Sequence, residues 1–590
     1  MWHSGGKSQA GASGKASASQ EIWRWSVSNP LHIRSISVAH PLHARYTSVV
    51  LLVSPAACCP QLSLSHSGGP RLSTLPLSGA NDPDESRNPP GACEPVSSPI
   101  LLQLRGGLVY YLPYCMGKEF SITPRAVPHV ETKYRRIVSK LPHPDSVPTL
   151  EKLRRFEPQA MRGQPPLVWD RAEDFSVYDK YGNRWMDWSS GVLVTNAGHG
   201  APEVRQAIID QVNSGLLHNY VFPSEERAAL AEALVKVAPK GLDKAFLLTT
   251  GSEATECALK LTRAHGILKG GRKKIGIVSA ERGFHGRTLG AQQAGGMPAQ
   301  KSWIVNEDPA IVQVPFPDGY WTEDTSFELF LATLAKKGLR PEDVAGVMFE
   351  TFQGVGPDFA PVEYIQQLAK WCKAQGALLV FDEVQAGFGR TGKFWAFEHY
   401  GVTPDLICCG KGISSSLPLS AVIGRAEIMD QFGPGSMSST HTGNPVCCAA
   451  ALASLKKITG EKLTENAARM GKILDAGLKE IQARHADVIG HYSCRGLVGG
   501  LQITKPGKKE PNHDLAHDIV ERCFHKGLLF FCPVGAWGQT VKIAPPLTIT
   551  GEAVREGLAV LGEVVDEAVA ASQQAAKRER RQPATNGVLG

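Results

Sequence analysis

The stretch KAFLLTTGSEATECALKLTRAH, residues 244–265, decides the fold because an apolar run passes directly into a helical pattern. Residues 244–250 are typical of a buried strand, and residues 253–265 carry apolar side chains at helical spacing. A strand followed at once by a helix is half of a βα unit, and repeated units of this kind build parallel sheets. The stretch therefore predicts an α/β protein.

The same alternation continues on both sides of this junction and predicts a mostly parallel sheet. From about residue 462 the order becomes helix, strands, helix, strands and a final helix at 551–571, which is typical of a smaller α+β domain. Residues 175–188 alternate apolar and polar side chains around a Tyr-Gly-Asn turn and predict a hairpin. The further strand-like runs are 274–280, 344–350, 377–383 and 405–410, and the further helical patterns are 203–214, 224–237, 363–375 and 445–457.

These patterns divide the chain into five segments. Residues 1–115 are rich in Ser, Pro, Gly and His without a sustained helical or strand period, so we expect disorder there. Because Met116 opens a stretch of different character, this segment is interpreted as an upstream extension, with a targeting peptide as the alternative. The other expected segments are 116–200, which contributes to a small domain, a large domain at 201–460, the C-terminal small domain at 461–571, and a disordered tail at 572–590.

Composition is that of a globular protein, with 42% hydrophobic and 20% charged residues. The net charge of +7 is small for 590 residues, and the basic run 577–581 is interpreted as a solvated tail rather than a nucleic-acid contact. Thirteen cysteines occur without CxxC pairs or metal-ligand spacing, so we expect reduced thiols and no metal site. The best membrane candidate, residues 48–53, falls far short of the ~20 residues that a span needs. We therefore expect a cytoplasmic protein with neither membrane nor nucleic-acid partners.

The junction at Gly251 and Ser252 has the chemistry of a phosphate site. A helix that starts directly after a strand presents unpaired N–H groups and a partial positive charge at its first turn. Glycine lets the backbone approach an anion closely, and the Ser252 hydroxyl adds a donor. An ordinary helix cap formed by Ser followed by Glu is the alternative.

Two further strands each deliver one ionisable side chain. The run 377–382 ends on Asp382, at the end of a strand where open α/β sheets bind ligands. An acid there needs a cationic partner: a pyridine nitrogen would be kept protonated by Asp382, while Gln385 could donate to a ring oxygen, and a carboxylate capping the next turn is the alternative. The strand 405–410 is followed by Lys411 between two glycines, and burial would lower the pKa of its amine and make it a nucleophile. A buried pair with a carboxylate is the alternative for this lysine.

Together and in this order, the three motifs resemble the class III aminotransferases, which include 4-aminobutyrate, ornithine and acetylornithine aminotransferases and the dialkylglycine decarboxylases. The resemblance runs from roughly Phe175 to Ala568. It implies the fold-type I architecture of pyridoxal-phosphate enzymes, with a seven-stranded type of sheet in the large domain. Other matching motifs are Ser190-Gly191, Asn196 to Gly200, Phe284 to Thr288, Glu350 with Gln353-Gly354, Thr440 to Pro445 and Ala544 to Leu547.

The resemblance also implies roles for individual residues. Lys411 would form the Schiff base with pyridoxal phosphate and then move a proton between the substrate carbon and the cofactor C4′ atom. Asp382 would pair with the pyridine nitrogen. Thr440 would reach the phosphate of a neighbouring subunit, so a homodimer or a dimer of dimers is expected. The remaining implied contacts are Gln385 to the phenolic oxygen, Phe284 stacked on the ring with His285 beside it in the same motif, Gly251 and Ser252 at the phosphate, and Glu350 in the polar network near the ring.

Substrate choice depends on three positions. Arg287 stands where relatives that act on amino acids with a distal carboxylate grip that carboxylate, and a structural ion pair is its alternative role. Dual-specificity members carry an arginine for the α-carboxylate where this chain has Lys542, and a glutamate that neutralises this arginine where it has Val355. Lysine offers a point charge without the arginine fork, so weakened α-carboxylate binding is expected.

We therefore expect transfer of an amino group from an ω-amino acid or related amine to a 2-oxo acid by a ping-pong mechanism. The alternatives are another class III activity, such as alanine–glyoxylate or amine–pyruvate transfer, decarboxylation-dependent transfer or amino-acid epimerisation. A non-catalytic binding or scaffold protein is a further hypothesis, but Lys411, Asp382 and the phosphate loop are all present.

Overall fold

The computed structural model describes residues 33–38, 47–52, 61–64, 101–103, 109–111 and 118–581. The chain divides into two compact units, Met1–Val96 and Ser97–Gly590. In the first unit, strands β1 (Ile33–Val38), β2 (Thr47–Leu52) and β3 (Gln61–Leu64) pair antiparallel. The second unit begins with the hairpin of β4 (Leu101–Gln103) and β5 (Val109–Tyr111). The disorder expected for the rest of residues 1–115 falls outside the described residues and stays a prediction.

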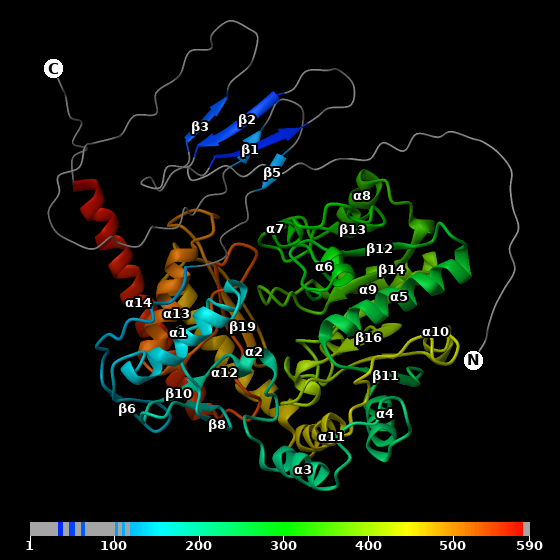
Figure 1. The fold of residues 1–590 in the computed structure, drawn as a ribbon, viewed down its shortest axis with the longest axis horizontal. Coiled ribbons are helices and arrows are strands. Elements are labelled where there is room, and N and C mark those ends of the chain that lie inside the picture. The colour runs from blue at the N-terminus through cyan, green and yellow to red at the C-terminus, as the bar shows by residue number, and fades with distance from the viewer. Residues whose placement is uncertain are drawn as a thin grey trace, which may run out of the picture. The chain divides into compact units, whose positions relative to one another are not determined.

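The largest sheet of residues 118–581 has seven strands in the order β11-β17-β16-β15-β14-β12-β13 (Figure 1). Neighbours from β13 to β16 run parallel, whereas β17 is antiparallel to both β16 and β11. Because two reversals cancel, β11 again points the same way as β16. The mostly parallel seven-stranded sheet is confirmed. Its strands are β11 (Lys244–Leu248), β12 (Gly276–Ala280), β13 (Ile311–Val314), β14 (Val344–Glu350), β15 (Leu378–Asp382), β16 (Leu406–Cys409) and β17 (Ser420–Gly424).

Both faces of this sheet are buried, which explains why its strands are continuous apolar runs rather than alternating ones. On β15, Leu378 and Val380 pack in one apolar cluster with residues of α5 (Gly251–Gly270). Leu379 and Phe381 point the other way, into the main cluster that contains residues of α8 (Phe327–Lys337) and α9 (Val362–Gln375). The sheet is thus held between two helical layers, as the βα pattern predicts.

The C-terminal part forms a smaller layer around the antiparallel sheet β18-β19-β21. Helix α14 packs against both α12 and α13, and these elements gather on one side of Figure 1 in orange and red. A separate sheet, β6-β7-β10-β9-β8, comes from residues 130–187, and β20 joins it by pairing with β10. The N-terminal segment therefore packs with the C-terminal part, although the expected domain boundaries themselves stay a prediction. The strands are β6 (Val130–Glu131), β7 (Arg136–Ile137), β8 (Arg171–Glu173), β9 (Ser176–Tyr178), β10 (Arg184–Asp187), β18 (Ile489–Arg495), β19 (Val498–Ile503), β20 (Leu528–Leu529) and β21 (Thr540–Ile543).

The five helical patterns predicted up to residue 457 are present as α3, α4, α5, α9 and α11, whereas α1 and α8 were not predicted. The predicted hairpin at 175–188 is also confirmed, as strands β9 and β10. The remaining α-helices are α1 (Val147–Phe156), α2 (Ser190–Leu193), α3 (Pro202–Asn213), α4 (Glu225–Val237), α6 (Leu289–Ala294), α7 (Pro298–Lys301), α10 (Ala426–Met429), α11 (Pro445–Gly460), α12 (Leu463–Arg484), α13 (His513–His525) and α14 (Gly551–Arg581). The 3-10 turns are η1 (Pro144–Ser146), η2 (Gln159–Met161), η3 (Pro341–Asp343), η4 (Ala396–Tyr400) and η5 (Lys411–Ile413).

Some features differ from the sequence expectations, and others add to them. Strands β13 and β17 were not expected from the sequence. Helix α14 continues ten residues past the expected end at 571, because Ala, Gln, Lys, Glu and Arg after Ala571 are strong helix formers. The nine cysteines within residues 118–581 are free, in keeping with the expected reduced thiols. Among the described residues, no helix combines the length and apolarity needed to cross a membrane.

Candidate active site

Three strand ends bring the predicted site residues to one edge of the sheet. Asp382 is the last residue of β15, Lys411 follows β16 by two residues, and Gly251 follows β11 by three. Because β11, β15 and β16 all point the same way, their carboxyl ends lie along the same edge. In the register of the sheet Asp382 stands directly opposite Glu350, the last residue of β14. Residues far apart in the sequence therefore meet where α/β sheets bind ligands.

Asp382 and His285 form a buried ion pair at this edge. The His285 Nδ1 atom lies 2.8 Å from the Asp382 Oδ2 atom. Burial acts to lower the pKa of His285, but the hydrogen bond and charge of Asp382 outweigh it and raise the pKa. The other carboxylate oxygen of Asp382 accepts a hydrogen bond of 3.0 Å from the Val384 amide. Asp382 is thus fixed in position by a side chain and a backbone group.

Lys411 lies in a strained backbone position at the start of η5. Its φ of 45° falls in the left-handed region, which costs a residue other than glycine about 1–3 kcal/mol. Burial lowers the pKa of the Lys411 amine, although the charges of Asp382 and Glu350 oppose this shift. A lowered pKa increases the fraction of neutral amine, which is the nucleophilic form.

The first turn of α5 has the geometry of an anion site. Thr250 caps the helix through a capping box with Glu253, so the turn that holds Gly251 and Ser252 is rigid. The Ser252 hydroxyl accepts a hydrogen bond of 3.2 Å from the Arg287 amide, which ties the loop of residues 284–287 to the helix end. The first amides of a helix have no intrahelical acceptor and are free to bind an anion.

Gly286 sits at the closest approach between this loop and the helix. A Cβ atom at Gly286 would lie 2.3 Å from the Ser252 Oγ atom, and the φ of 132° is unfavourable for any side chain. We expect Gly286→Ala to displace Ser252 and to raise the dissociation constant for pyridoxal phosphate about tenfold, the effect of losing one hydrogen bond to a charged group. The measurement is a spectrophotometric titration with the cofactor.

Gly338 provides the matched control. It also has a positive φ, of 74°, but no atom lies within 4 Å of an added Cβ. Gly338→Ala should lower the melting temperature without changing cofactor affinity. Equal cofactor affinity in both variants would contradict the assignment of the phosphate site.

Glu350 connects two loops above the sheet edge. One carboxylate oxygen accepts a hydrogen bond of 2.9 Å from the Phe284 amide, and the other accepts one of 2.8 Å from the Gly354 amide. Burial and the charge of Asp382 raise the pKa of Glu350 to about 7, with His285 opposing them. Glu350 therefore holds the backbone on which Phe284 and Gly354 sit, which fits the supporting role expected from the resemblance.

Lys542 reaches the same region from β21. Its Nζ atom lies 2.7 Å from the Gln385 Oε1 atom and also donates to the Gly354 carbonyl oxygen. Burial and repulsion by Lys411 lower the pKa of Lys542 to about 7. Sequence reasoning placed Lys542 in the substrate site, but no sequence signal indicated its contact with Gln385.

Arg287 and Thr440 are the most exposed of the predicted site residues. The Arg287 guanidinium lies 5.5 Å from the centre of the Phe284 ring and 3.4 Å from the Gln300 Oε1 atom. Thr440 lies in the loop before α11, and its neighbour Ser439 contacts Glu253 at the start of α5 at 3.4 Å. The structure therefore places the Thr440 loop beside the phosphate site of its own chain.

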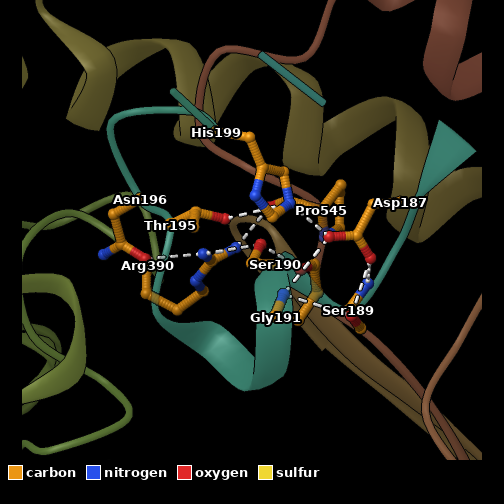
Figure 2. A network of polar contacts seen from close by, with 10 residues as sticks. Asp187, Ser189, Ser190, Gly191, Thr195, Asn196, His199, Arg390 and Pro545 are labelled. Atoms are coloured by element: carbon orange, nitrogen blue, oxygen red, sulfur yellow. Dashed lines mark hydrogen bonds and ion pairs between the residues drawn. The ribbon is translucent and has the colours of Figure 1, made fainter. Parts of the chain in front are cut away.

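Sequence reasoning missed a buried arginine, Arg390, which lies in a polar network next to the site. Figure 2 shows this network. Arg390 donates to the Ser190 hydroxyl at 3.2 Å and to the Asn196 Oδ1 atom at 2.7 Å, as well as to two backbone carbonyls. The Asn196 amide packs so closely on Gly412 that a Cβ there would lie 2.5 Å from the Asn196 Nδ2 atom. Burial lowers the pKa of Arg390 to about 9. The network thus supports the backbone next to Lys411. In the sequence, only the position of Arg390 in the run Gly387 to Gly392 could have indicated this role.

The residues present fit pyridoxal phosphate. The His285 Nε2 atom is buried without a hydrogen-bond partner, beside a carboxylate suited to a pyridine nitrogen. Gly251, Gly286 and Gly354 all stand where a Cβ would collide with a neighbouring side chain, so the backbone is closely packed around the edge. Lys411 supplies an amine that can condense with an aldehyde, and α5 supplies amides for a phosphate.

Comparison with known proteins finds the family that the sequence motifs resemble. The sequence model of the family described as aminotransferase class III matches residues 159–565. A 4-aminobutyrate aminotransferase of Mycobacterium leprae is 32% identical over 73% of this chain and 98% of its own length. A 5-aminovalerate aminotransferase of Pseudomonas aeruginosa is 34% identical over 71% of this chain and 98% of its own length. Among solved structures, a Bacillus anthracis aminotransferase has a TM-score of 0.66 at 29% identity over 72% of this chain and 99% of its own.

Proposed function

The chain belongs to the class III aminotransferases, and from that membership we propose that it moves an amino group from an ω-amino acid to a 2-oxo acid with pyridoxal phosphate as cofactor. The fold and family expected from the sequence are confirmed. The observation that carries the proposal is the partly buried Lys411 amine with its lowered pKa, at the sheet edge where Asp382 stands opposite Glu350. The relatives named for 4-aminobutyrate and 5-aminovalerate support the ω-amino acid as donor.

Each residue has a proposed task in this reaction. Bound pyridoxal phosphate supplies an aldehyde that condenses with amines and a ring that stabilises negative charge on the neighbouring carbon. Asp382 holds the proton on the ring nitrogen, and the Lys411 Nζ atom carries a proton to and from the substrate carbon. Phe284 would cover one face of the ring, Gln385 would donate to its phenolic oxygen, and the first turn of α5 would bind the phosphate.

Arg287 is the proposed anchor for the distal carboxylate of the donor. It is exposed next to the Phe284 ring, and the described residues give its guanidinium the neutral partner Gln300 rather than an acid. A free guanidinium fork suits a carboxylate. The structural ion pair considered as the alternative is therefore the weaker interpretation.

The proposed acceptor is a 2-oxo acid. The changes at Lys542 and Val355 make pyruvate or glyoxylate as plausible an acceptor as 2-oxoglutarate. Lys542 is already bonded to Gln385 and Gly354, so it differs from the arginine fork of dual-specificity relatives. Amine–pyruvate or alanine–glyoxylate transfer is thus the second candidate function.

We also propose a homodimer in which Thr440 reaches the phosphate of the partner subunit. The support is the exposure of Thr440. A cytoplasmic location is proposed as well, with targeting by residues 1–115 as the alternative. Analytical ultracentrifugation and the location of a tagged full-length chain test these two proposals.

The activity is tested by adding donors one at a time to the holoenzyme and recording its visible spectrum. The donors are 4-aminobutyrate, 5-aminovalerate, β-alanine, glutamate and butylamine, and each acceptor is then added to restore the starting spectrum. Bleaching by ω-amino acids with full recovery is expected. Release of carbon dioxide, or racemisation of a chiral donor without an acceptor, would indicate one of the other class III activities.

Arg287→Gln is expected to raise the KM for 4-aminobutyrate about tenfold or more, because a charge-assisted hydrogen bond is worth about 1.5–3 kcal/mol. Butylamine is the matched substrate, since it has the same chain length without the carboxylate. Its kcat/KM should stay within about twofold of wild type. An equal loss with both donors would show that Arg287 supports the loop and does not bind the carboxylate.

A further inference from the structure

Lys542 and Gln385 form a contact that neither residue's expected role explains. Lys542 is 3% exposed and lies on the central part of β21. Its Nζ atom donates to the Gln385 Oε1 atom at 2.7 Å and to the Gly354 carbonyl oxygen. Two of the three N–H donors of the lysine are therefore used within the protein.

This contact determines which way the Gln385 amide faces. The ammonium form of Lys542 bears only donors, so in that form the atom of Gln385 that it contacts must be the carbonyl oxygen. The NH2 group of Gln385 must then point away from Lys542. Gly354 packs against this amide so closely that a Cβ at Gly354 would lie 2.0 Å from the Gln385 Nε2 atom. The amide is thus held on one side by a hydrogen bond and on another by backbone packing.

We propose that Lys542 is a positioning residue that fixes the Gln385 amide with its NH2 group available to the cofactor's phenolic oxygen, and that it is not a carboxylate anchor. The proposal rests on the proposed function, since it assigns a task towards pyridoxal phosphate. It assigns Lys542 to the cofactor side of the site and leaves carboxylate binding to Arg287.

The hydrogen bonds and the charge of Lys542 both fit a positioning role. A substrate carboxylate would find at most one donor of Lys542 free, because Gln385 and the Gly354 carbonyl oxygen already take the other two. Burial and the neighbouring Lys411 hold the pKa of Lys542 near 7, so the amine is only partly charged at neutral pH. A neutral amine still donates two hydrogen bonds but attracts a carboxylate weakly.

The test is a double-mutant cycle with Lys542→Met and Gln385→Met, read out as the dissociation constant for pyridoxal phosphate and the visible band of the full-length holoenzyme. Each single variant should weaken cofactor binding about tenfold and shift the band, the effect of one hydrogen bond to a charged group. The double variant should be no weaker than Gln385→Met alone, because Lys542 acts through Gln385.

Lys274→Met is the matched control. Lys274 is also buried, and it donates to the carbonyl oxygens of Glu342 and Gln375. It precedes β12 and lies at the amino edge of the sheet, away from the site. Losing this lysine should lower the melting temperature and leave cofactor affinity and the visible band unchanged.

Gln385→Glu keeps the proposal testable if Lys542→Met does not fold. A glutamate would keep an acceptor oxygen for Lys542 and form an ion pair with it, so this variant should melt higher than Gln385→Met, which keeps no acceptor. It should still weaken cofactor binding as much as Gln385→Met does, because it lacks the NH2 group.

Two results would overturn the proposal. One is a Lys542→Met variant with wild-type cofactor affinity and band but an increased KM for the 2-oxo acid, which would make Lys542 a carboxylate anchor. The other is an additive cycle in which the two losses multiply to about a hundredfold, which would make the residues independent. If wild-type protein binds no pyridoxal phosphate, the proposed function itself fails, and this outcome is distinguishable from both.

Discussion

Lys411→Ala is expected to reduce kcat with every donor by about 10⁴-fold or more, because one side chain both forms the covalent link and transfers the proton. The structure supports both tasks through the burial that lowers the pKa of this amine and through the charges of Asp382 and Glu350 beside it. Single-turnover rates with 4-aminobutyrate give the loss directly. The variant should still bind pyridoxal phosphate, because the phosphate contacts do not involve Lys411.

Borohydride reduction provides the control for this prediction. Reduction should attach the cofactor permanently to Lys411 in wild type and leave it removable by dialysis in Lys411→Ala. Peptide mapping must separate Lys411 from Lys542, since both amines lie in the same site and have lowered pKa values. Label on Lys542 in the wild-type protein would overturn the assignment of the reactive lysine.

Asp382→Asn is expected to lower kcat about 10²–10³-fold, the usual loss when one preorganised charge is removed from a reaction site. Asparagine keeps the shape and can still accept from the Val384 amide, so the change isolates the charge. The pKa of His285 is raised by Asp382 and should fall in the variant. An NMR titration of His285 should therefore show loss of its proton at lower pH than in wild type.

Asp405→Asn is the matched control, since Asp405 is a largely buried carboxylate directly before β16, at the amino edge of the sheet. It accepts from the Leu379 amide and pairs with Arg425. This variant should be less stable but should keep kcat within about twofold of wild type. Similar losses of kcat in both aspartate variants would mean that Asp382 serves the fold rather than the cofactor.

The linear arrangement of βα units was readable from the chain because hydrophobic periodicity is a local property. Three apolar runs each predicted a strand with a site residue at its carboxyl end, namely Gly251, Asp382 and Lys411. Parallel strand order then implied that these ends share one edge. Strand β17 was missed because only Ala421, Val422 and Ile423 of its five residues carry apolar side chains, which is too short a run to form a distinct pattern.

The sequence alone determined the α/β class and the family, and it predicted Lys411, Asp382 and the phosphate junction as site residues, because each motif consists of residues close together along the chain. Only the tertiary structure decided that Lys542 contacts Gln385, that Glu350 ties together the loops at Phe284 and Gly354, and that Arg390 supports the backbone beside Lys411. The physical reason is distance along the chain. Lys542 and Gln385 are 157 residues apart, so their contact depends on how the C-terminal sheet packs against the central one, which no local pattern encodes.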